Sequence, residues 1–383
     1  MTLATELFDD LTALDELRAD WDQLAVAYGL PLMAPGPVLA WWQHRAPGGA
    51  EPRVVVVRDH GELIGIAPFF VVTGRPGRID YRLPGIDLGT RLAPLAAASR
   101  EWEVAGAVAI ALAEATPRPD LIALESVPPG SLWLTALRDQ WPGRLRPLSS
   151  LYNVRGSPTV DLRGSFAEWL AGRSSSFRKN QRRRARMFAE AGGTMRLGTL
   201  ETLTDDIAAL MRLHTERWSG RGTSSLVAQS DRFKEMLQTA GRELTTSGRF
   251  RIWIMEIDGQ PIWANLFLSA GGELLAVNSG WDERWRKLSP ATLGMVHAIE
   301  DAFERGERRL DLGVGEDPYK LEFADGNDPV GWGVLIPSGR RMALTALRTS
   351  PMLVNSAARR TAKRTLTPQR LDTLRDMRRR LRA

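Results

Sequence analysis

Two separate parts of this sequence carry the same hairpin pattern. Val54–Val72 and Ile252–Leu268 each contain a strand-like run, a turn built on Asp and Gly, and a second run with a small residue near its start. A short Asp/Gly turn between two such runs is typical of an antiparallel hairpin. The small residues are Gly65 in the first hairpin and Ala264 in the second. The recurrence predicts two copies of one α+β unit, and 383 residues are enough for two hydrophobic cores.

Helical and strand-like patterns surround both hairpins in a similar order. In the first half, apolar spacing predicts helices at Asp15–Tyr28, Glu101–Ala115 and Ser131–Gln140 and a strand at Leu121–Val127. In the second half it predicts helices at Thr204–Trp218, Asp231–Ser247 and Pro290–Arg305, and strands at Thr194–Leu197, Glu273–Ser279, Arg309–Gly313 and Val330–Ile336. Both halves therefore fit an α+β class with a mixed sheet.

A long basic helix is predicted between the two units. Residues Phe166–Ala191 keep helical spacing throughout, and Gly192-Gly193 is a good C-terminal cap. Within this helix, Arg173–Arg186 holds seven Lys/Arg and no acid. We therefore expect a first lobe at 1–165, a basic connecting helix at 166–193, a second lobe at 194–340 and a basic helical tail at 341–383.

Positive charge is concentrated in two segments of the chain. Besides the connecting helix, Arg359–Arg382 holds ten Lys/Arg against two Asp, which more than accounts for the net charge of +6. A general nucleic-acid-binding protein more often spreads its charge over one face. The apolar residues of the tail helix opened by Thr367-Pro368 lie on one side: Leu371, Leu374, Met377 and Leu381. Two interpretations remain open, a helix that docks on an anionic membrane or a partner, and a stripe packed on the protein itself.

Several classes of protein are excluded or disfavoured by what the sequence lacks. The longest apolar run, Val104–Ala113, is too short to span a bilayer, and the first residues lack the pattern of a signal peptide, so we expect a cytoplasmic protein. The absence of cysteine excludes disulfides and thiolate chemistry. There is no G-x-S-x-G, phosphate-loop or H-E-x-x-H motif, and the four histidines lack metal-ligand spacing, so no metal is expected.

The strongest local signal for a ligand site lies just before the helix predicted at Pro290–Arg305. A basic loop follows the preceding strand, and Ser289 occupies the N-cap position of the helix. The free backbone N–H groups of Ala291, Thr292 and Leu293 at the helix start, together with the nearby cations, are expected to bind phosphate groups. The expected anion-binding residues are Arg284, Arg286, Lys287, Ser289, Ala291 and Thr292. The alternative is an ordinary capped helix beside a solvated basic loop.

These residues resemble a known motif. Arg286-Lys-Leu-Ser289-Pro-Ala291 is similar to the acyl-CoA motif R/Q-x-x-G-x-G/A of the GNAT acyltransferases, with serine in place of the first glycine. More of the chain resembles the GNAT-related family of cellulose and exopolysaccharide biosynthesis (CelD/BcsL-like), and the layout is similar to that of the Fem-type peptidoglycan aminoacyltransferases. The resemblance covers most of residues 40–335. The segments that carry it are Phe177-Arg178-Lys179 followed by Arg182-Arg183, Gly192-Gly193, Leu213-His214, Arg217-Trp218, Leu288-Ser289-Pro290, Asp311-x-Gly313 and Tyr319-Lys320.

The resemblance implies tandem GNAT-like lobes, with the active site in the second lobe and a degenerate first lobe. It implies an N- or O-acyltransferase that uses acetyl-CoA or another acyl-CoA as co-substrate. The expected acceptor is an amine or hydroxyl of a sugar, a polysaccharide precursor or a small metabolite. We expect direct attack on the thioester, because no nucleophile for a covalent intermediate is visible.

Three residues near the end of the second lobe are the catalytic candidates, because acyl transfer needs a base, a proton donor and stabilisation of the carbonyl oxygen. Asp311 is the candidate base or ligand of the acceptor ammonium, Lys320 the candidate oxyanion stabiliser and Tyr319 the candidate proton donor. The alternatives are that Asp311 caps a turn, Lys320 is a surface charge and Tyr319 is a core residue.

The candidate residues for acceptor binding are Arg178, His214, Trp218, Asn278 and Trp281. His214 is also a candidate general base, although a single helical histidine is more often structural. Two other functions remain open. One is aminoacyl transfer from aminoacyl-tRNA, in which the basic helix and the tail contact tRNA phosphates. The other is a non-catalytic role in envelope assembly.

Overall fold

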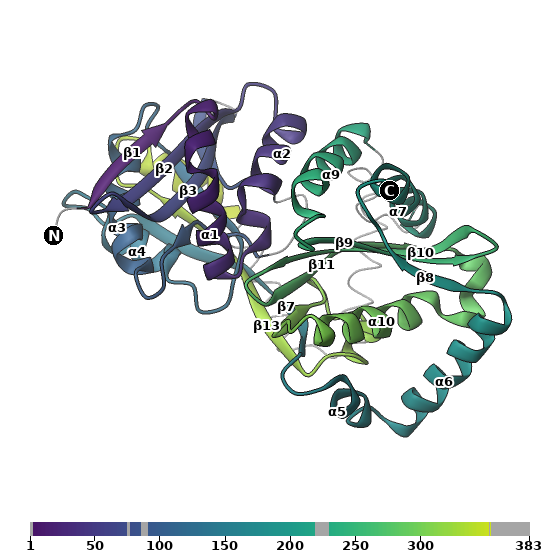
Figure 1. Cartoon of the computed structure of the whole chain (residues 1–383). Coiled ribbons are helices and arrows are strands. Elements are labelled where there is room, and N and C mark those ends of the chain that lie inside the picture. Colours follow the sequence, from purple (N-terminus) through teal and green to yellow (C-terminus); the bar gives the residue numbers. More distant parts are fainter. Residues whose placement is uncertain (1–2, 75–76, 86–90, 219–229, 352, 354–383) are drawn as a thin grey trace, which may run out of the picture.

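In the first unit, four helices pack around one part of a twisted sheet (Figure 1). The computed structural model describes residues 3–74, 77–85, 91–218, 230–351 and 353. In chain order, the elements of the first unit are β1 (Ala4–Phe8), α1 (Arg18–Tyr28), α2 (Pro35–Arg45), β2 (Glu51–Asp59), β3 (Glu62–Gly74), β4 (Arg78–Arg82), β5 (Leu95–Ala96), α3 (Glu101–Glu114), β6 (Leu121–Val127), α4 (Trp133–Asp139) and β7 (Leu148–Asp161). The hairpin β2–β3 is the one that the sequence predicts.

The second unit repeats this order. Its elements are β8 (Thr194–Leu197), α7 (Leu203–Trp218), α9 (Asp231–Leu244), β9 (Phe250–Ile257), β10 (Gln260–Ala270), β11 (Glu273–Trp281), the 3-10 helix η4 (Glu283–Leu288), α10 (Pro290–Glu304), β12 (Arg309–Asp311), α11 (Pro318–Leu321) and β13 (Gly326–Ile336). Helices α5 (Phe166–Ala171) and α6 (Ser175–Glu190) connect the units. Apart from β5 and the 3-10 turns, the elements correspond one by one, which confirms the predicted duplication and the α+β class.

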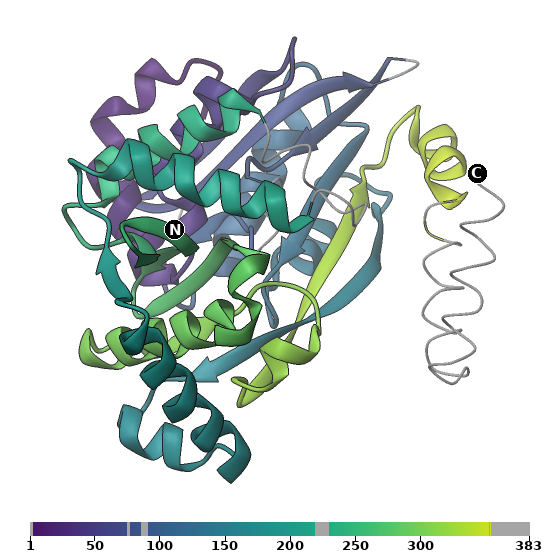
Figure 2. The same cartoon turned by 90° about the vertical axis from the view of Figure 1, so that its right-hand side faces the viewer.

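The two units share one continuous sheet. Its strand order is β1-β2-β3-β4-β6-β13-β7-β12-β11-β10-β9-β8, and β5 pairs with β3 outside this path. The last strands of the units change places at the centre: β7 pairs with β12 of the second unit, and β13 pairs with β6 of the first. These two long strands also pair with each other, and Figure 2 shows them side by side. Neither unit therefore completes its part of the sheet without the other.

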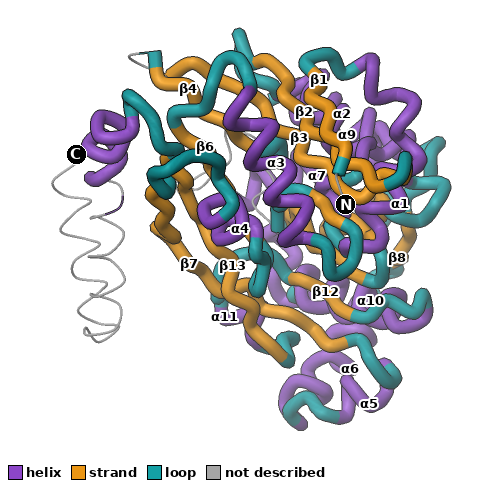
Figure 3. The backbone as a smooth tube through the Cα atoms, turned by 90° about the vertical axis from the view of Figure 1, so that its left-hand side faces the viewer, coloured by secondary structure: helices purple, strands orange, loops and turns teal. Residues whose placement is uncertain are grey.

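Helices cover both faces of this sheet. In the second unit, α7 and α9 lie on one side and α10, α5 and α6 on the other (Figure 1). In the first unit, α3 and α4 lie over the strands that face the viewer in Figure 3. One large hydrophobic cluster extends through both units, from Trp21 of α1 to Leu210 of α7. A second cluster lies beneath α10 and contains Trp263, Phe267 and Phe323.

The structure corrects the prediction of one continuous helix at Phe166–Ala191. The segment forms two helices, because Ser174 starts a new one: its side chain accepts a hydrogen bond from the Phe177 N–H at 3.2 Å. A serine that can cap a helix favours a start over an interior position. At the other end of α6, Gly192 has a φ of 68°, which confirms the predicted cap.

Four elements of the first unit were not predicted: β1, β4, β5 and α2. Helix α2 begins with Pro35-Gly-Pro37, a sequence that also suits a turn, although proline is well tolerated in a first helical turn. In the tail, residues 342–351 are helical, whereas the helix predicted from Thr367 lies outside the described residues. In the part of the chain that the structure describes, no helix is long and apolar enough to cross a membrane.

Candidate active site

The parallel strands β11 and β12 separate in the middle of the second unit. They pair only over Glu273–Leu275 and Arg309–Asp311. Strand β12 ends there, whereas β11 continues to Trp281 and is paired only with β10 on its other side. We call the unpaired side of residues 276–281 the open edge of β11. Its register against β10 shifts at residue 277, which marks a β-bulge, a feature that often occurs beside active sites.

Helix α7 lies unusually close to this open edge because Gly280 has no side chain. A Cβ atom at Gly280 would lie 2.2 Å from the backbone nitrogen of His214. The close approach brings the His214 ring to the strand, where Nδ1 lies 2.9 Å from the Ser279 carbonyl oxygen. A carbonyl oxygen only accepts, so Nδ1 carries the proton and Nε2 carries the lone pair. Burial lowers the pKa of His214, so the ring is neutral at pH 7.

A cationic and aromatic cluster lies at the end of the open edge. The Arg217 guanidinium carbon lies 4.8 Å from the centre of the Trp281 ring, and the same guanidinium donates to Glu283. Tyr319 in α11 is 40% exposed, so the alternative of a core residue is wrong. Desolvation of its hydroxyl and the charge of Asp317 raise its pKa to about 12, and the charge of Arg217 acts in the opposite direction. Arg217 is therefore close enough to influence Tyr319 electrostatically. Helices α7 and α11 thus contribute His214, Arg217 and Tyr319 to the same region.

Asp311 occupies a different position from the one expected of a base. Its carboxylate is 2% exposed and forms an ion pair with Arg91 of the first unit. It also accepts hydrogen bonds from the Ser157 hydroxyl at 2.5 Å and the Gly313 N–H at 2.8 Å. Because both oxygens are engaged and buried, the structure corrects the expectation that Asp311 takes a proton from an acceptor. The turn-capping alternative describes its contact with Gly313 better.

Lys320 is buried and bonded to the backbone of the preceding loop. Its ammonium donates to the Gly313 carbonyl at 2.9 Å and to the Val314 carbonyl at 3.4 Å, and only 8% of the residue is exposed. Burial lowers the pKa of Lys320. The alternative of a surface charge is therefore wrong, but the contacts shown are with the protein itself: two backbone carbonyls and, at 4.0 Å, the Asp317 carboxylate. A role in stabilising the oxyanion stays a prediction.

The basic loop before α10 divides into paired and unpaired cations. The Arg284 guanidinium binds Asp282 at 2.6 Å, so Arg284 is already neutralised. Arg286 and Lys287 are exposed, and neither forms an ion pair within the described residues. Arginine and lysine in this state suit a ligand that carries phosphate groups.

The start of α10 differs from the predicted cap. Ser289 has a φ of 48°, and its side chain makes no capping hydrogen bond. Its carbonyl accepts hydrogen bonds from the N–H groups of Thr292 at 2.9 Å and Leu293 at 3.1 Å. Two of the three N–H groups that we expected to bind an anion are therefore used within the helix. The cations of the loop are therefore more available to bind an anion than the N–H groups at the helix start.

Two further candidates lie elsewhere. The Arg178 guanidinium donates to the Arg173 carbonyl at 2.6 Å and to the Ala171 carbonyl, so it caps the end of α5. The structure therefore corrects the expectation that Arg178 binds the acceptor: its contacts are structural. The side chain of Trp218 lies outside the described part of the chain. Asn278 lies on the open edge, and its side chain acts to raise the pKa of His214, against the larger effect of burial. Ser279, the carbonyl partner of His214, was missed, because nothing in the sequence indicates which strand residue faces α7.

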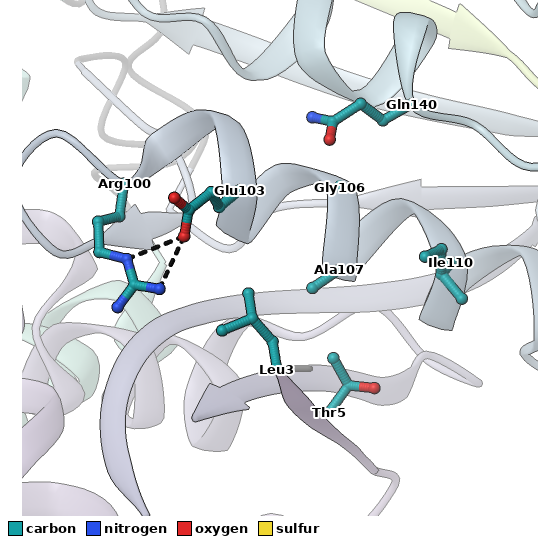
Figure 4. A pocket seen from close by; sticks show the side chains of 8 residues that line it. All are labelled: Leu3, Thr5, Arg100, Glu103, Gly106, Ala107, Ile110 and Gln140. Atoms are coloured by element: carbon teal, nitrogen blue, oxygen red, sulfur yellow. Dashed lines mark hydrogen bonds and ion pairs between the residues drawn. The ribbon is translucent and has the colours of Figure 1, made fainter. Parts of the chain in front are cut away.

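A cavity of about 650 Å³ lies in the first unit, away from the open edge. It opens between β1 and α3, and Figure 4 shows Leu3, Ile110 and the ion-paired Arg100 and Glu103 around it. None of its lining residues belongs to the second unit. Among the described residues, no cluster of three or more His, Asp or Glu side chains could hold a metal ion. His214, Arg217 and Tyr319 do not line this cavity.

Comparison with known proteins found one family model that matches part of the chain. A family model described as an acetyltransferase (GNAT) domain matches residues 175–321, which extend from the start of α6 to the end of α11. No curated protein sequence is matched. The likeness to the CelD/BcsL-like family therefore stays a prediction, whereas α6 and most of the second unit are similar to a GNAT acetyltransferase domain.

Solved structures show the same fold over most of the chain. The crystal structure of FemX is similar with a TM-score of 0.60 at 11% identity, over 88% of this chain and 98% of that one. A conserved protein of unknown function from Bacteroides thetaiotaomicron gives a TM-score of 0.51 at 10% identity, over 87% and 100%. At these identities the likeness concerns the fold.

Proposed function

We propose that this protein, whose second unit is a GNAT-fold acyltransferase domain, transfers an acyl group from acyl-CoA to an amine or hydroxyl acceptor at the open edge of β11. The observation that carries the proposal is the neutral His214 ring held at this edge by Ser279. The acceptor class, a sugar, a polysaccharide precursor or a small metabolite, is part of the proposal. Trp281 at the end of the edge offers an aromatic surface to such an acceptor.

The proposed reaction is a direct displacement. The acceptor nitrogen or oxygen attacks the acyl carbon, and the carbon–sulfur bond of the thioester breaks as the new bond forms. His214 Nε2 takes the proton that the acceptor loses, a role that suits a neutral imidazole whose other nitrogen is held as a donor. The Tyr319 hydroxyl protonates the departing thiolate. With a pKa of about 12 it carries its proton at neutral pH.

Arg286 and Lys287 are the proposed ligands of the donor phosphates. Both side chains are exposed beside the start of α10, and neither forms an ion pair in the described part of the protein. Arg284 contributes less, because Asp282 already neutralises it. The phosphates of acyl-CoA would bring the negative charge that this loop lacks.

Charge reversal at this loop tests the donor site. The double variant Arg286→Glu with Lys287→Glu should weaken acetyl-CoA binding by about 2 kcal/mol or more, measured by calorimetry. The matched control is Arg232→Glu with Arg242→Glu, which reverses two exposed charges on α9 and should leave the affinity unchanged. Equal affinities of the two double variants would show that the donor phosphates bind elsewhere.

A second candidate function, transfer from aminoacyl-tRNA, is favoured by the outer face of α6. Four cations lie on this face at helical spacing, all exposed and without ion pairs among the described residues: Lys179, Arg182, Arg183 and Arg186. The core-facing residues Phe177 and Phe188 lie on the opposite side of the helix. A bare basic helix of this kind suits a phosphate backbone.

Binding assays separate these functions. A thermal shift with acyl-CoA alone supports the first, and a shift with tRNA supports the second. If tRNA contacts α6, Arg182→Gln with Arg183→Gln should reduce the slope of log affinity against log salt by about 0.9 for each phosphate that is no longer neutralised. A protein that responds to neither ligand would favour the non-catalytic role.

A further inference from the structure

A cluster of buried charges joins the two units beside the proposed active site. Arg91 comes from the first unit, just before β5, and is 8% exposed. Its guanidinium pairs with Asp311 at the end of β12 and with Asp328 in β13 at 2.7 Å. One residue of the first unit thus binds two acids of the second.

The contacts of Arg91 continue into the loop that leads to α11. Asp311, held by Arg91, accepts from the Gly313 N–H at 2.8 Å, and the Gly313 carbonyl accepts from Lys320 at 2.9 Å. Strand β7 contacts the same loop, because the Pro158 carbonyl accepts from the Leu312 N–H at 2.9 Å. An unbroken series of polar contacts therefore leads from Arg91 to the helix that carries Tyr319.

Asp311 depends on Arg91 more than Asp328 does. Asp328 also receives the Arg309 guanidinium at 2.6 Å, so it keeps a cationic partner without Arg91. Asp311 is 2% exposed, and its other hydrogen-bond partners are the neutral Ser157 hydroxyl and the Gly313 N–H. The charge of Lys320 acts on Asp311 from a greater distance, without an ion pair between them among the described residues. A buried carboxylate without a cation is strongly disfavoured, so loss of Arg91 acts on the Asp311 side of the cluster.

We propose that Arg91 is a positioning residue for the acyl-transfer site: through Asp311 it holds the segment 312–317, and thereby fixes Tyr319 of α11 relative to the open edge of β11. This inference rests on the proposed function for its catalytic consequence, but not for its structural part. The backbone of Arg91 agrees with a constrained role, because its φ of 36° is uncommon for a residue other than glycine.

Hydrogen exchange on the full chain tests the inference without an activity assay. Arg91→Met should raise amide exchange in the segment 312–317 by about tenfold, because the segment opens locally more often. Arg53→Met is the matched control. Arg53 is also a buried arginine of the first unit, at 7% exposed, and it donates to the Thr116 carbonyl and to Glu51. It should leave exchange in 312–317 unchanged.

A double variant separates positioning from charge balance. In Arg91→Met with Asp311→Asn, the buried charge is gone and thermal stability should recover, but exchange in 312–317 should stay high. Full recovery of protection would mean that Arg91 only neutralises Asp311, and the proposal would fail. If Arg91→Met does not fold, Arg91→Lys serves, because a lysine cannot hold both acids in the same geometry.

Turnover provides the catalytic readout. With the acceptor in hand, Arg91→Lys should lower kcat about tenfold or more and change KM for the acyl donor little, because a misplaced proton donor affects the chemical step. An unchanged kcat together with raised exchange would overturn the catalytic role of Arg91. Unchanged exchange in both single variants would overturn the inference whether or not the protein transfers acyl groups.

Discussion

Replacement of Gly280 by alanine tests how α7 positions His214. The added Cβ would lie 2.2 Å from the His214 backbone nitrogen and 2.3 Å from the Leu213 carbonyl carbon. Both are backbone atoms, so no side chain can rotate away. An ordinary contact needs about 3.4 Å, and α7 must therefore move away from β11 by roughly 1 Å.

The cost of this displacement follows from what α7 buries. Leu210 and Leu213 are fully buried, and Met211 is 2% exposed. Overpacking of this kind typically costs about 1–3 kcal/mol, and loss of the His214–Ser279 hydrogen bond adds about 1 kcal/mol. We therefore expect Gly280→Ala to lower the free energy of unfolding by about 2–4 kcal/mol in urea titrations.

Gly48→Ala is the control for this experiment. A Cβ atom at Gly48 would meet nothing within 4 Å, so its effect on stability should stay within about 0.5 kcal/mol. Magnetic resonance of the His214 ring gives a second readout, because the displaced ring should titrate closer to the usual histidine pKa. If Gly280→Ala equals the control in stability and the His214 titration is unchanged, the close approach of α7 does not position the ring.

Three further predictions follow from the site and the tail. Burial lowers the pKa of His214 below 6.5, so the unfolded chain binds the proton more readily and stability should fall as pH drops through about 6.5. In urea titrations from pH 5 to 8, His214→Gln should weaken this dependence, and an identical profile for both proteins would contradict the prediction. Lys320→Met leaves the buried Gly313 carbonyl without its partner and should cost about 1–3 kcal/mol of unfolding free energy, whereas a loss under 0.5 kcal/mol would show that the contact is dispensable. For the tail, full-length protein should sediment with anionic but not neutral vesicles, and a chain ending at Leu366 should stay folded in the supernatant. If the shorter chain unfolds, or if neither protein sediments, the tail has a structural role.

Local signals in the sequence were sufficient to predict both hairpins and most of the other elements. The turns at Asp59-His60-Gly61 and Asp258-Gly259 take positive φ values, which suit Asp, Gly and His in a tight hairpin, and both hairpins form where predicted. The strand at Leu121–Val127 forms with its predicted bounds. These features depend on a few adjacent residues, so the sequence alone indicates them. The break before Ser174 also depends on adjacent residues, but its N-cap serine was overlooked within a long helical pattern.

The site depended on contacts between residues far apart in the chain. From the sequence, Asp311 beside a glycine-rich turn had the properties of a catalytic base, and nothing nearby indicated that Arg91 would neutralise it. His214 was one of several candidates until the fold brought it against Ser279. A titratable group acquires its role from the charges and the solvent around it, and both are set by tertiary packing.

The duplicated pattern in the sequence determined that this chain forms two α+β units, because periodicity and turn chemistry act over short distances. Only the tertiary structure decided that β7 and β13 change places at the centre of one sheet. Strand pairing across units depends on backbone hydrogen bonds that every residue offers, so no local side-chain pattern specifies the partner. The same exchange brings Ser157 of β7 and Asp328 of β13 to Arg91 and Asp311, and with them the support of the proposed active site.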